Sequence, residues 1–466
     1  MSRKKLNNEE RYSTKKALLY SFAGLTDVIN FQFFSFLIFT FYWAVVGLNV
    51  NLITIGYIIW SIWNAVNDPL LGALSDRTKS KWGRRKPYII AGIYPLCIIT
   101  IFLWTPIRTD QISLFLYFLI IIIIWEFFYT MWSLNQTALF PEMFKNLDER
   151  AKANTVIQIF QVISLLIAFI LPSAFIPKYD DPQYATEYIY AGIAIAIICA
   201  VTATIFIKFG LKERIEFSRD PETAPSLFKS LKYSLKSKAF LTYIVANFAL
   251  WYVFGMLPTL TPLYGDFVLG IEDSFILSLL LAVAFISAAF FILMWRVVLL
   301  KFGAKITFIL VLIVFIITLS PLMFASDLTS GFIAFFFVGV GLAGALMIRD
   351  VTISAIIDED ELKTGTRREG GFYGINALIV KSGNIFVFLS ISLVFNSVGW
   401  AVFDPVGTTE QTIFGLKSLM FIFPAVVLLI GLISILFFPI NKERYQGLTE
   451  KARELHAEKK SKIQTN

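Results

Sequence analysis

The chain has 466 residues, of which 57% are hydrophobic, 16% aromatic and 16% charged, and its formal net charge is +8. A mean hydropathy of +0.71 is well above that of a soluble domain, so the composition excludes an ordinary soluble enzyme and predicts a polytopic membrane protein. There are one His and two Cys. Cys97 and Cys199 both lie in apolar segments, so we expect buried thiols and no metal or redox centre.

The polar segment 1–16 leads into an apolar stretch too long for a signal-peptide core, so we expect the first helix to stay in the mature protein. A bilayer-spanning helix needs about 20 mostly apolar residues. Twelve segments meet this requirement, at 17–46, 52–75, 87–105, 111–138, 153–176, 187–209, 239–265, 274–298, 305–324, 330–357, 371–399 and 413–439.

The longest polar stretch between these spans divides them six and six. The predicted organisation is a tail at 1–16, a six-helix bundle at 17–209, a central loop at 210–238, a second bundle at 239–439 and a tail at 440–466. Most Lys and Arg lie in the tails and in the loops after even-numbered spans, which predicts cytoplasmic termini by the positive-inside rule. These basic residues would face the anionic leaflet, so the positive charge does not require a nucleic-acid partner.

The loops after the fourth and tenth spans resemble each other. PEMFKNLDERAK at 141–152 and DEDELKTGTRREG at 358–370 both place acids about eight residues before an arginine. Two copies of a six-helix unit would explain this similarity, although short, common compositions also match by chance. Six plus six helices predict a transporter that binds its solute between the halves, near the midplane.

Several charged residues lie inside the predicted spans. A carboxylate at the centre of a membrane helix costs about 2.5–3.5 kcal/mol on insertion scales, so it normally faces a cavity or a partner. Asp68 is therefore a functional candidate, and it shares one helical face with Asn64. Asp27, Glu126 and Lys381 are further intramembrane charges, whereas neutral polar residues could simply join helices at about 0.6 kcal/mol per hydrogen bond.

Two further groups in the spans leave alternatives open. Arg349 and Asp350 are adjacent in the tenth span, where they could pair with other buried charges or lie near the cytoplasmic mouth. Indole rings near the polar faces could stack on a sugar, or could belong to an interfacial belt or to ordinary packing. The indoles concerned are those of Trp60, Trp63, Trp125, Trp132 and Trp251.

The segment DPLLGALSDRTKSKWGRRKP, which begins at Asp68, resembles the signature of the glycoside-pentoside-hexuronide:cation symporter family within the major facilitator superfamily. WSLNQTALFPEMFKNLDERAK, from Trp132, and AIIDEDELKTGTRREGGFYGINALIVKSG, from Ala355, resemble two further regions of that family. The resemblance implies the all-α major facilitator fold, with 12 transmembrane helices in two six-helix bundles. It also implies cation-coupled solute transport without enzymatic activity or an organic cofactor.

The family resemblance places a cation site on the second span. In melibiose-permease-like members an acid there lies in an Asn-Asp-Pro context, which Asn67, Asp68 and Pro69 reproduce. A second acid lies four residues earlier in those proteins, where this chain has Asn64. With one fewer acid, the site would hold sodium less strongly, which favours protons over sodium as the coupling ion.

Two other members of the implied cation site lie on later spans. The family's helix 4 acid falls on Phe128, two residues from Glu126, and its helix 11 lysine is matched by Lys381. If Lys381 is close to Asp68, it would stabilise the charged acid and act as an internal cation. The candidates for cation binding, with Na+ as the possible metal, are Asp68, Asn64, Asn67, Glu126 and Lys381.

The substrate positions depart further from the family pattern. The helix 5 arginine of melibiose-type permeases falls on Gln158, and their helix 1 acid falls on or beside Asp27, so galactoside specificity is not implied. The substrate-binding candidates are Asp27, Gln158, Trp132, Tyr373, Asn376 and Lys381. Charged residues at the cytoplasmic helix ends could form ion pairs when the cytoplasmic side of the transporter closes. Alternatively, they could be ordinary solvated loop residues. These gate candidates are Asp76, Arg77, Arg84, Glu142, Arg150, Asp358, Arg367 and Arg368.

The sequence therefore predicts a monomeric, multi-pass symporter of the cell membrane. It would couple H+ or Na+ to transport of a sugar, glycoside, pentoside or uronate by alternating access. One alternative is a transporter of lipids or amphipathic solutes within the same superfamily. A non-translocating sensor or scaffold is a second alternative, disfavoured by the short central loop, and the single His456, in a charged tail, gives no support for an enzyme.

Overall fold

The structure is a computed structural model that describes residues 14–78, 80, 82–107, 110–144, 147–211, 233–364, 369–445, 447, 448, 450 and 451. For helical residues 73, 76, 77, 141, 142, 147, 148, 150, 151, 369 and 370 only the backbone is described. The described residues form helices and connecting segments without a β-strand. The chain divides into two compact units, Met1–Thr223 and Ala224–Asn466.

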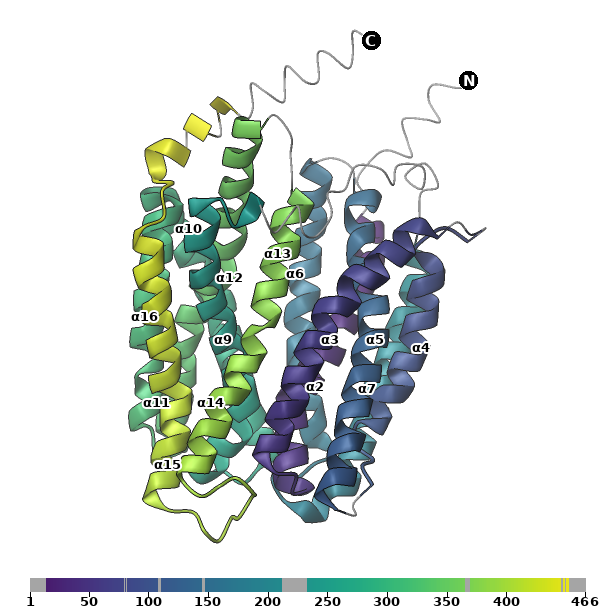
Figure 1. Cartoon of the computed structure of the whole chain (residues 1–466), viewed down its shortest axis with the longest axis vertical. Helices are drawn as coiled ribbons and strands as arrows, with labels where there is room; N and C mark the ends of the chain where they lie inside the picture. Colours follow the sequence, from purple (N-terminus) through teal and green to yellow (C-terminus); the bar gives the residue numbers. More distant parts are fainter. Residues whose placement is uncertain are drawn as a thin grey trace. The chain divides into compact units, whose positions relative to one another are not determined.

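The first unit contains a helix at each of the six positions predicted for it (Figure 1). Several helices end in a short turn of different pitch. In order they are α2 (Thr14–Thr40) with a π-helical turn η1 (Phe41–Val45), α3 (Val50–Arg77), α4 (Lys86–Phe102), α5 (Gln111–Met143), α6 (Leu147–Ile170) with a 3-10 turn η2 (Leu171–Ala174), the 3-10 turn η3 (Pro182–Tyr184), and α7 (Ala185–Ile205) with a π-helical turn η4 (Phe206–Gly210).

The second unit is also entirely helical in its described part (Figure 1). Its elements are α9 (Lys238–Phe267), α10 (Ser274–Leu319), α11 (Pro321–Phe324), α12 (Leu328–Thr364), α13 (Glu369–Lys381), α14 (Gly383–Ser397), α15 (Glu410–Lys417), the π-helical turn η6 (Ser418–Ile422) and α16 (Phe423–Leu436). Together they cover the six spans predicted for this half of the chain.

Local geometry explains where predicted spans join or break. α10 contains two predicted spans, and Gly303 between them has φ 77° and ψ 173°, a conformation that residues with a Cβ rarely adopt. The predicted span 371–399 is divided into α13 and α14, which meet at Ser382. At the start of α5, Asp110 accepts hydrogen bonds from the backbone N–H groups of Ile112 and Ser113, which caps the helix.

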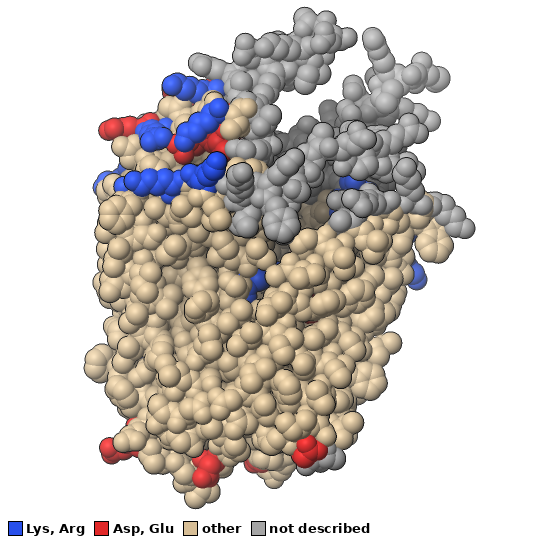
Figure 2. Space-filling model, in the orientation of Figure 1, with Lys and Arg blue, Asp and Glu red and all other residues tan. Residues whose placement is uncertain are grey.

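The helices are long and apolar enough for a membrane. Among the described residues, nine helices meet this requirement by length and hydropathy, and one of them, Ser274–Phe324, covers two predicted spans. α4 is a shorter apolar helix, and α3 carries the polar face described below. In Figure 2 a broad uncharged band covers the middle of each unit's visible face, and charged side chains gather mainly beyond it. This distribution is typical of a protein that crosses a bilayer.

Close helix packing positions α5 within the first unit. α4 and α5 pack together, as do α3 and α5. At Gly92 of α4, an added Cβ would lie 2.9 Å from Cβ of Met131 and 3.0 Å from the backbone N of Trp132. The glycine therefore lets α4 approach α5 closely, and this contact fixes the part of α5 that carries the buried polar residues.

Candidate cation and solute sites

The polar face of α3 contains the Asn-Asp-Pro segment. Asn64 and Asn67 are buried, whereas Asp68 is partly exposed. Pro69 lies inside the helix and has no backbone N–H, so the carbonyl of Ala65 receives no helical hydrogen bond from it. The proline therefore leaves one backbone oxygen of α3 available near the Asn-Asp-Pro segment.

A threonine of α5 connects two intramembrane carboxylates. The Thr130 hydroxyl lies 3.1 Å from Oδ1 of Asp68 and 3.2 Å from Oε1 of Glu126. One hydroxyl has a single proton, so it can donate to only one of the two oxygens at a time. Thr130 therefore joins Asp68 of α3 to Glu126 of α5 in one polar cluster.

Two asparagines of α3 hold Glu126 in this cluster. Asn64 Nδ2 donates a 2.7 Å hydrogen bond to Glu126 Oε1, and Asn67 Nδ2 donates a 3.4 Å bond to the Glu126 backbone carbonyl. Glu126 has no exposed surface. The structure thus brings together Asp68, Asn64, Asn67 and Glu126, which are four of the five cation candidates.

This geometry adds a contact that the sequence did not specify. On α3 Asn64 stands where the family pattern has an acid, and it hydrogen bonds to Glu126, a cation candidate that supplies a second carboxylate from α5. Thr130 was not among the candidates, although its position four residues after Glu126 places it on the same face of α5. Asp68, Glu126, Thr130, Asn64 and Asn67 together form the carboxylate cluster.

Electrostatics favours a cation in the carboxylate cluster. Asp68 and Glu126 both lie within hydrogen-bond distance of one hydroxyl, and two ionised carboxylates about 6 Å apart repel each other by roughly 3 kcal/mol at an effective dielectric constant of about 20. A proton on one acid, or an oxygen-coordinated ion between them, removes this repulsion. The described residues contain no group of three or more His, Cys, Asp or Glu placed to hold a metal ion, so a transition-metal site has no support there.

A second polar group lies on α2 and α5. Asp27 of α2 is partly exposed, and its carboxylate lies close enough to the Tyr129 hydroxyl of α5 to interact with it electrostatically. The Tyr129 ring stacks on Trp125 at 5.0 Å, and Trp125 Nε1 donates a 3.1 Å bond to Oδ1 of Asn30. The stacked aromatic residues therefore fix the tyrosine that lies near Asp27.

The other substrate candidates of the first unit are in contrasting environments. Gln158 of α6 is exposed, whereas the Trp132 indole of α5 has no exposed surface and packs edge-on against Phe206. A solute could contact the Trp132 ring only after a rearrangement of its neighbours, whereas the Gln158 side chain is not enclosed by the described residues.

The substrate candidates of the second unit lie on α13. Tyr373 is 41% exposed, and Asn376 accepts a 2.8 Å hydrogen bond from Nδ2 of Asn247 on α9. Lys381 is the last residue of α13, immediately before the helix break. Its amine is therefore carried at a point where the backbone of the predicted eleventh span is interrupted.

The gate candidates are only partly covered by the structure. Arg84 precedes α4 and Asp358 lies on α12, and both are partly exposed. The other six fall on residues or side chains outside the described part, namely Asp76, Arg77, Glu142, Arg150, Arg367 and Arg368. A contact not anticipated from the sequence joins Glu359 of α12 to Arg444, beyond α16.

An arginine of α12 stacks on two aromatic rings of α9. The Arg349 guanidinium carbon lies 4.6 Å from the ring centroid of Trp251 and 5.6 Å from that of Phe254. Its Nε is enclosed without a hydrogen-bond partner, and no ion pair of Arg349 is present among the described residues. Cation–π contacts supply about 0.5–2 kcal/mol, which is less than the roughly 2.5–3.5 kcal/mol cost of a charge at the helix centre.

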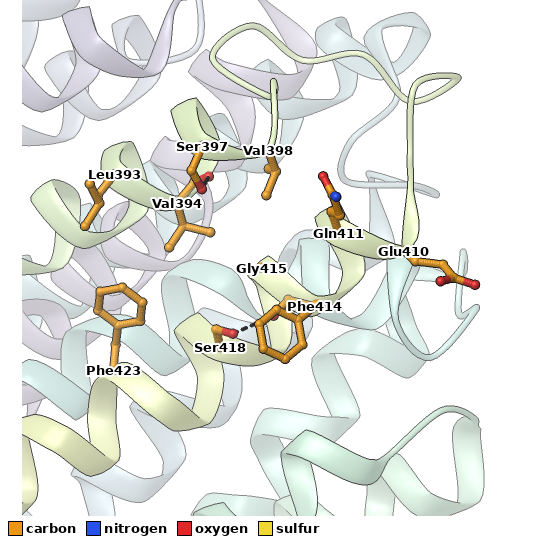
Figure 3. Close-up of a pocket in the computed structure, with 10 residues that line it drawn as sticks. All are labelled: Leu393, Val394, Ser397, Val398, Glu410, Gln411, Phe414, Gly415, Ser418 and Phe423. Atoms are coloured by element: carbon orange, nitrogen blue, oxygen red, sulfur yellow. Dashed lines mark hydrogen bonds between the residues drawn. The ribbon is translucent and has the colours of Figure 1, made fainter.

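A cavity of about 540 Å³ lies beside the end of α14, α15 and η6 (Figure 3). Its walls are mainly apolar, and Leu393 and Phe414 expose large parts of their side chains. None of the candidate cation, substrate or gate residues lines it. The cavity has the character of an apolar surface recess between helices and gives no support for a polar solute site.

Comparison with known proteins identifies the family. The sequence profile of the MFS/sugar transport protein family matches residues 20–442. The chain belongs to this family. An uncharacterized symporter of Synechocystis sp. is 25% identical, with 94% of this chain and 96% of the relative covered.

Two further relatives are named for different solutes. The lactose permease of Lactobacillus delbrueckii subsp. bulgaricus is 25% identical, covering 78% of this chain and 59% of the permease. Sodium-dependent lysophosphatidylcholine symporter 1-B of Danio rerio is 24% identical, covering 83% of this chain and 79% of that protein. The family and these relatives indicate that the chain is a secondary transporter of the symporter type. The relatives are named for a sugar in one case and a lipid in the other.

Solved structures support the fold. The crystal structure of the nucleoside transporter NupG has a TM-score of 0.63 at 16% identity and covers 92% of this chain and 100% of the NupG chain. This similarity shows the major facilitator fold, as the sequence predicted.

Proposed function

We propose that this protein couples the movement of a cation, H+ or Na+, to the transport of a sugar, glycoside, pentoside or uronate across the cell membrane. The observation that carries the proposal is the carboxylate cluster, in which Thr130 connects Asp68 to Glu126 inside apolar helices. Occupation by a cation would relieve the repulsion between the two acids and thereby favour one conformation of an alternating-access cycle.

The role of each residue follows from its contacts. Asp68 and Glu126 carry the negative charge that attracts the ion, and Thr130 supplies a hydroxyl oxygen between them. Asn64 keeps Glu126 oriented towards α3. Asp27, with Tyr129 beside it, offers hydrogen-bond acceptors for solute hydroxyls on the neighbouring helix α2.

Two features of the proposal rest on charge distribution and family resemblance. The excess of Lys and Arg in the tails and in the loops after even-numbered spans supports cytoplasmic termini. We further propose a monomeric transport unit, with the gate candidates forming contacts that change between the two states of the cycle. Lys381 would act as an internal cation that the coupling ion displaces.

Transport of a lipid or amphipathic solute is a second candidate function. It is favoured by the lysophosphatidylcholine symporter among the relatives and by the apolar recess beside α15. Purified protein in liposomes distinguishes the two functions, because labelled sugars and labelled lysophosphatidylcholine can be offered under identical imposed gradients.

The test measures uptake of a labelled sugar panel into liposomes with an inward H+ or Na+ gradient. We expect one of the two gradients to drive accumulation in the wild type, and Asp68→Asn or Glu126→Gln to abolish it. Asp110→Asn is a matched control, because it removes an acid at the start of α5, the helix that carries Glu126. The two positions are about 24 Å apart along the helix axis, at a rise of about 1.5 Å per residue. Gradient-driven sugar accumulation by both cluster variants would refute the proposal.

A further inference from the structure

Arg349 is an intramembrane cation that the proposed cation cycle does not use. It lies on α12 and stacks on Trp251 and Phe254 of α9, at 4.6 Å and 5.6 Å from their ring centroids. Trp251 is close to the middle of α9 (Lys238–Phe267) and is 37% exposed. The stacked group therefore lies near the membrane interior and reaches accessible surface of the second unit.

The Arg349 guanidinium has no hydrogen-bond acceptor among the described residues. A guanidinium carries five N–H donors in a rigid planar fork and no acceptor. Nε is enclosed without a partner, and Arg349 has no ion pair within the described ranges. Trp251 and Phe254 thus hold a charged donor group close to their rings, and the described residues offer it no carboxylate acceptor.

Other charged and phenolic groups near Arg349 do not replace that acceptor. Asp350 follows it on α12 but has an exposed side chain, and it forms no ion pair with Arg349. Asp350 and the buried Tyr243 of α9 are both near enough to interact electrostatically with Arg349. A planar oxyanion would meet two parallel N–H donors of a guanidinium, which is the arrangement that arginine favours with carboxylates.

We propose that Arg349, held by Trp251 and Phe254, is the binding subsite for an oxyanion of the transported solute, and that this oxyanion is the carboxylate of a sugar acid. The proposal rests on the proposed function and selects uronates from the four solute classes named there. Binding of the carboxylate gives the guanidinium two charge-assisted hydrogen bonds, and the exposed part of the Trp251 ring next to it provides apolar surface for the sugar ring.

The test compares D-glucuronate with D-glucose. D-glucuronate has a carboxylate at the position where D-glucose has a hydroxymethyl group. Thermal stabilisation of the full-length protein in nanodiscs is titrated with each sugar. We expect half-maximal stabilisation by D-glucuronate at a concentration at least about 10-fold lower than by D-glucose, because a charge-assisted bidentate contact is lost with the neutral sugar.

Variants assign this preference to the subsite. Arg349→Gln should abolish the difference between the two sugars, and Arg349→Lys should retain only part of it, because lysine has no planar fork. Trp251→Leu should reduce the preference without removing the charge. Arg296→Gln is the matched control, since Arg296 is an exposed arginine on α10 of the same unit, and it should preserve the wild-type preference.

Several outcomes would overturn the inference. Equal stabilisation of the wild type by the two sugars would do so, as would an undiminished preference in a folded Arg349→Gln variant. A third arm uses lysophosphatidylcholine, and Arg349-dependent stabilisation by this lipid but not by D-glucuronate would reject the sugar-acid assignment. Failure of the proposed function is distinct from these results, because it appears as absence of cation-driven sugar uptake irrespective of Arg349.

Discussion

The Asn64 side chain on α3 donates a 2.7 Å hydrogen bond to the buried carboxylate of Glu126 on α5. This contact joins the face that carries Asp68 to a second acid that has no exposed surface. Because a buried carboxylate without hydrogen-bond donors is strongly destabilised, the position of Glu126 depends on α3. α3 and α5 therefore each contribute one carboxylate to the carboxylate cluster.

Replacement of Asp68 by Asn should uncouple transport from the ion gradient. Downhill exchange of solute should persist, because the amide has nearly the shape of the carboxylate, whereas uphill accumulation should fall by at least about 10-fold, the effect of losing a contact worth about 1.4 kcal/mol. Parallel counterflow and gradient-driven uptake measurements test this prediction. Loss of both activities in folded protein would instead indicate a general defect in the transport cycle.

Thr130→Ala should weaken activation by the ion while leaving the two acids in place. Hydrogen bonds to charged groups contribute about 1.5–3 kcal/mol, so the half-activating ion concentration should rise by roughly 10- to 100-fold. Thr130→Ser is the matched control, because it retains the hydroxyl. Equal ion activation in Ala and Ser variants would contradict a role for the Thr130 oxygen.

The hydrogen bond between Asn64 and Glu126 should give non-additive effects. Asn64→Leu removes the donor and leaves a buried carboxylate acceptor, which should destabilise the protein by about 1–3 kcal/mol. In Glu126→Gln the same replacement of Asn64 should cost less. A double-mutant cycle of thermal stabilities in detergent measures the difference, and additive changes would indicate that the two side chains do not interact.

Gly92→Ala should destabilise the first unit by about 1–3 kcal/mol, because the new methyl group overpacks the interface of α4 and α5. Its Cβ would lie 2.9 Å from Cβ of Met131. Gly24→Ala on α2 is the control, since a Cβ there meets nothing within 4 Å and alanine favours a helix. Thermal unfolding should separate the two variants, and equal melting temperatures would argue against close packing at Gly92.

Hydropathy was sufficient to predict where most of the helices lie, because each span must satisfy its backbone hydrogen bonds within a long apolar segment. It was less informative about the ends and interruptions of helices. α5 continues to Met143, beyond the expected limit at 138, and the break after Lys381 follows from local backbone geometry that the hydropathy of residues 371–399 does not reveal.

The carboxylate cluster was only partly predictable. Asp68 was identified because a lone acid is conspicuous in an apolar helix, and Asn64 because it shares the same helical face. The pairing with Glu126 depends on the rotation and depth of α5 relative to α3, which no spacing within one helix specifies. Trp132 and Trp251 illustrate the same limit, since only packing shows that the first is enclosed and the second is exposed.

The most direct test of ion coupling at the carboxylate cluster is the current evoked by solute in proteoliposomes on a solid-supported membrane. We predict that a transported sugar produces an ion-dependent current in the wild type and in Asp110→Asn. The current should be absent in the Asp68→Asn and Glu126→Gln variants, provided that each variant still binds the sugar. A current of wild-type size in the double variant, with both acids neutralised, would contradict coupling through Asp68 and Glu126.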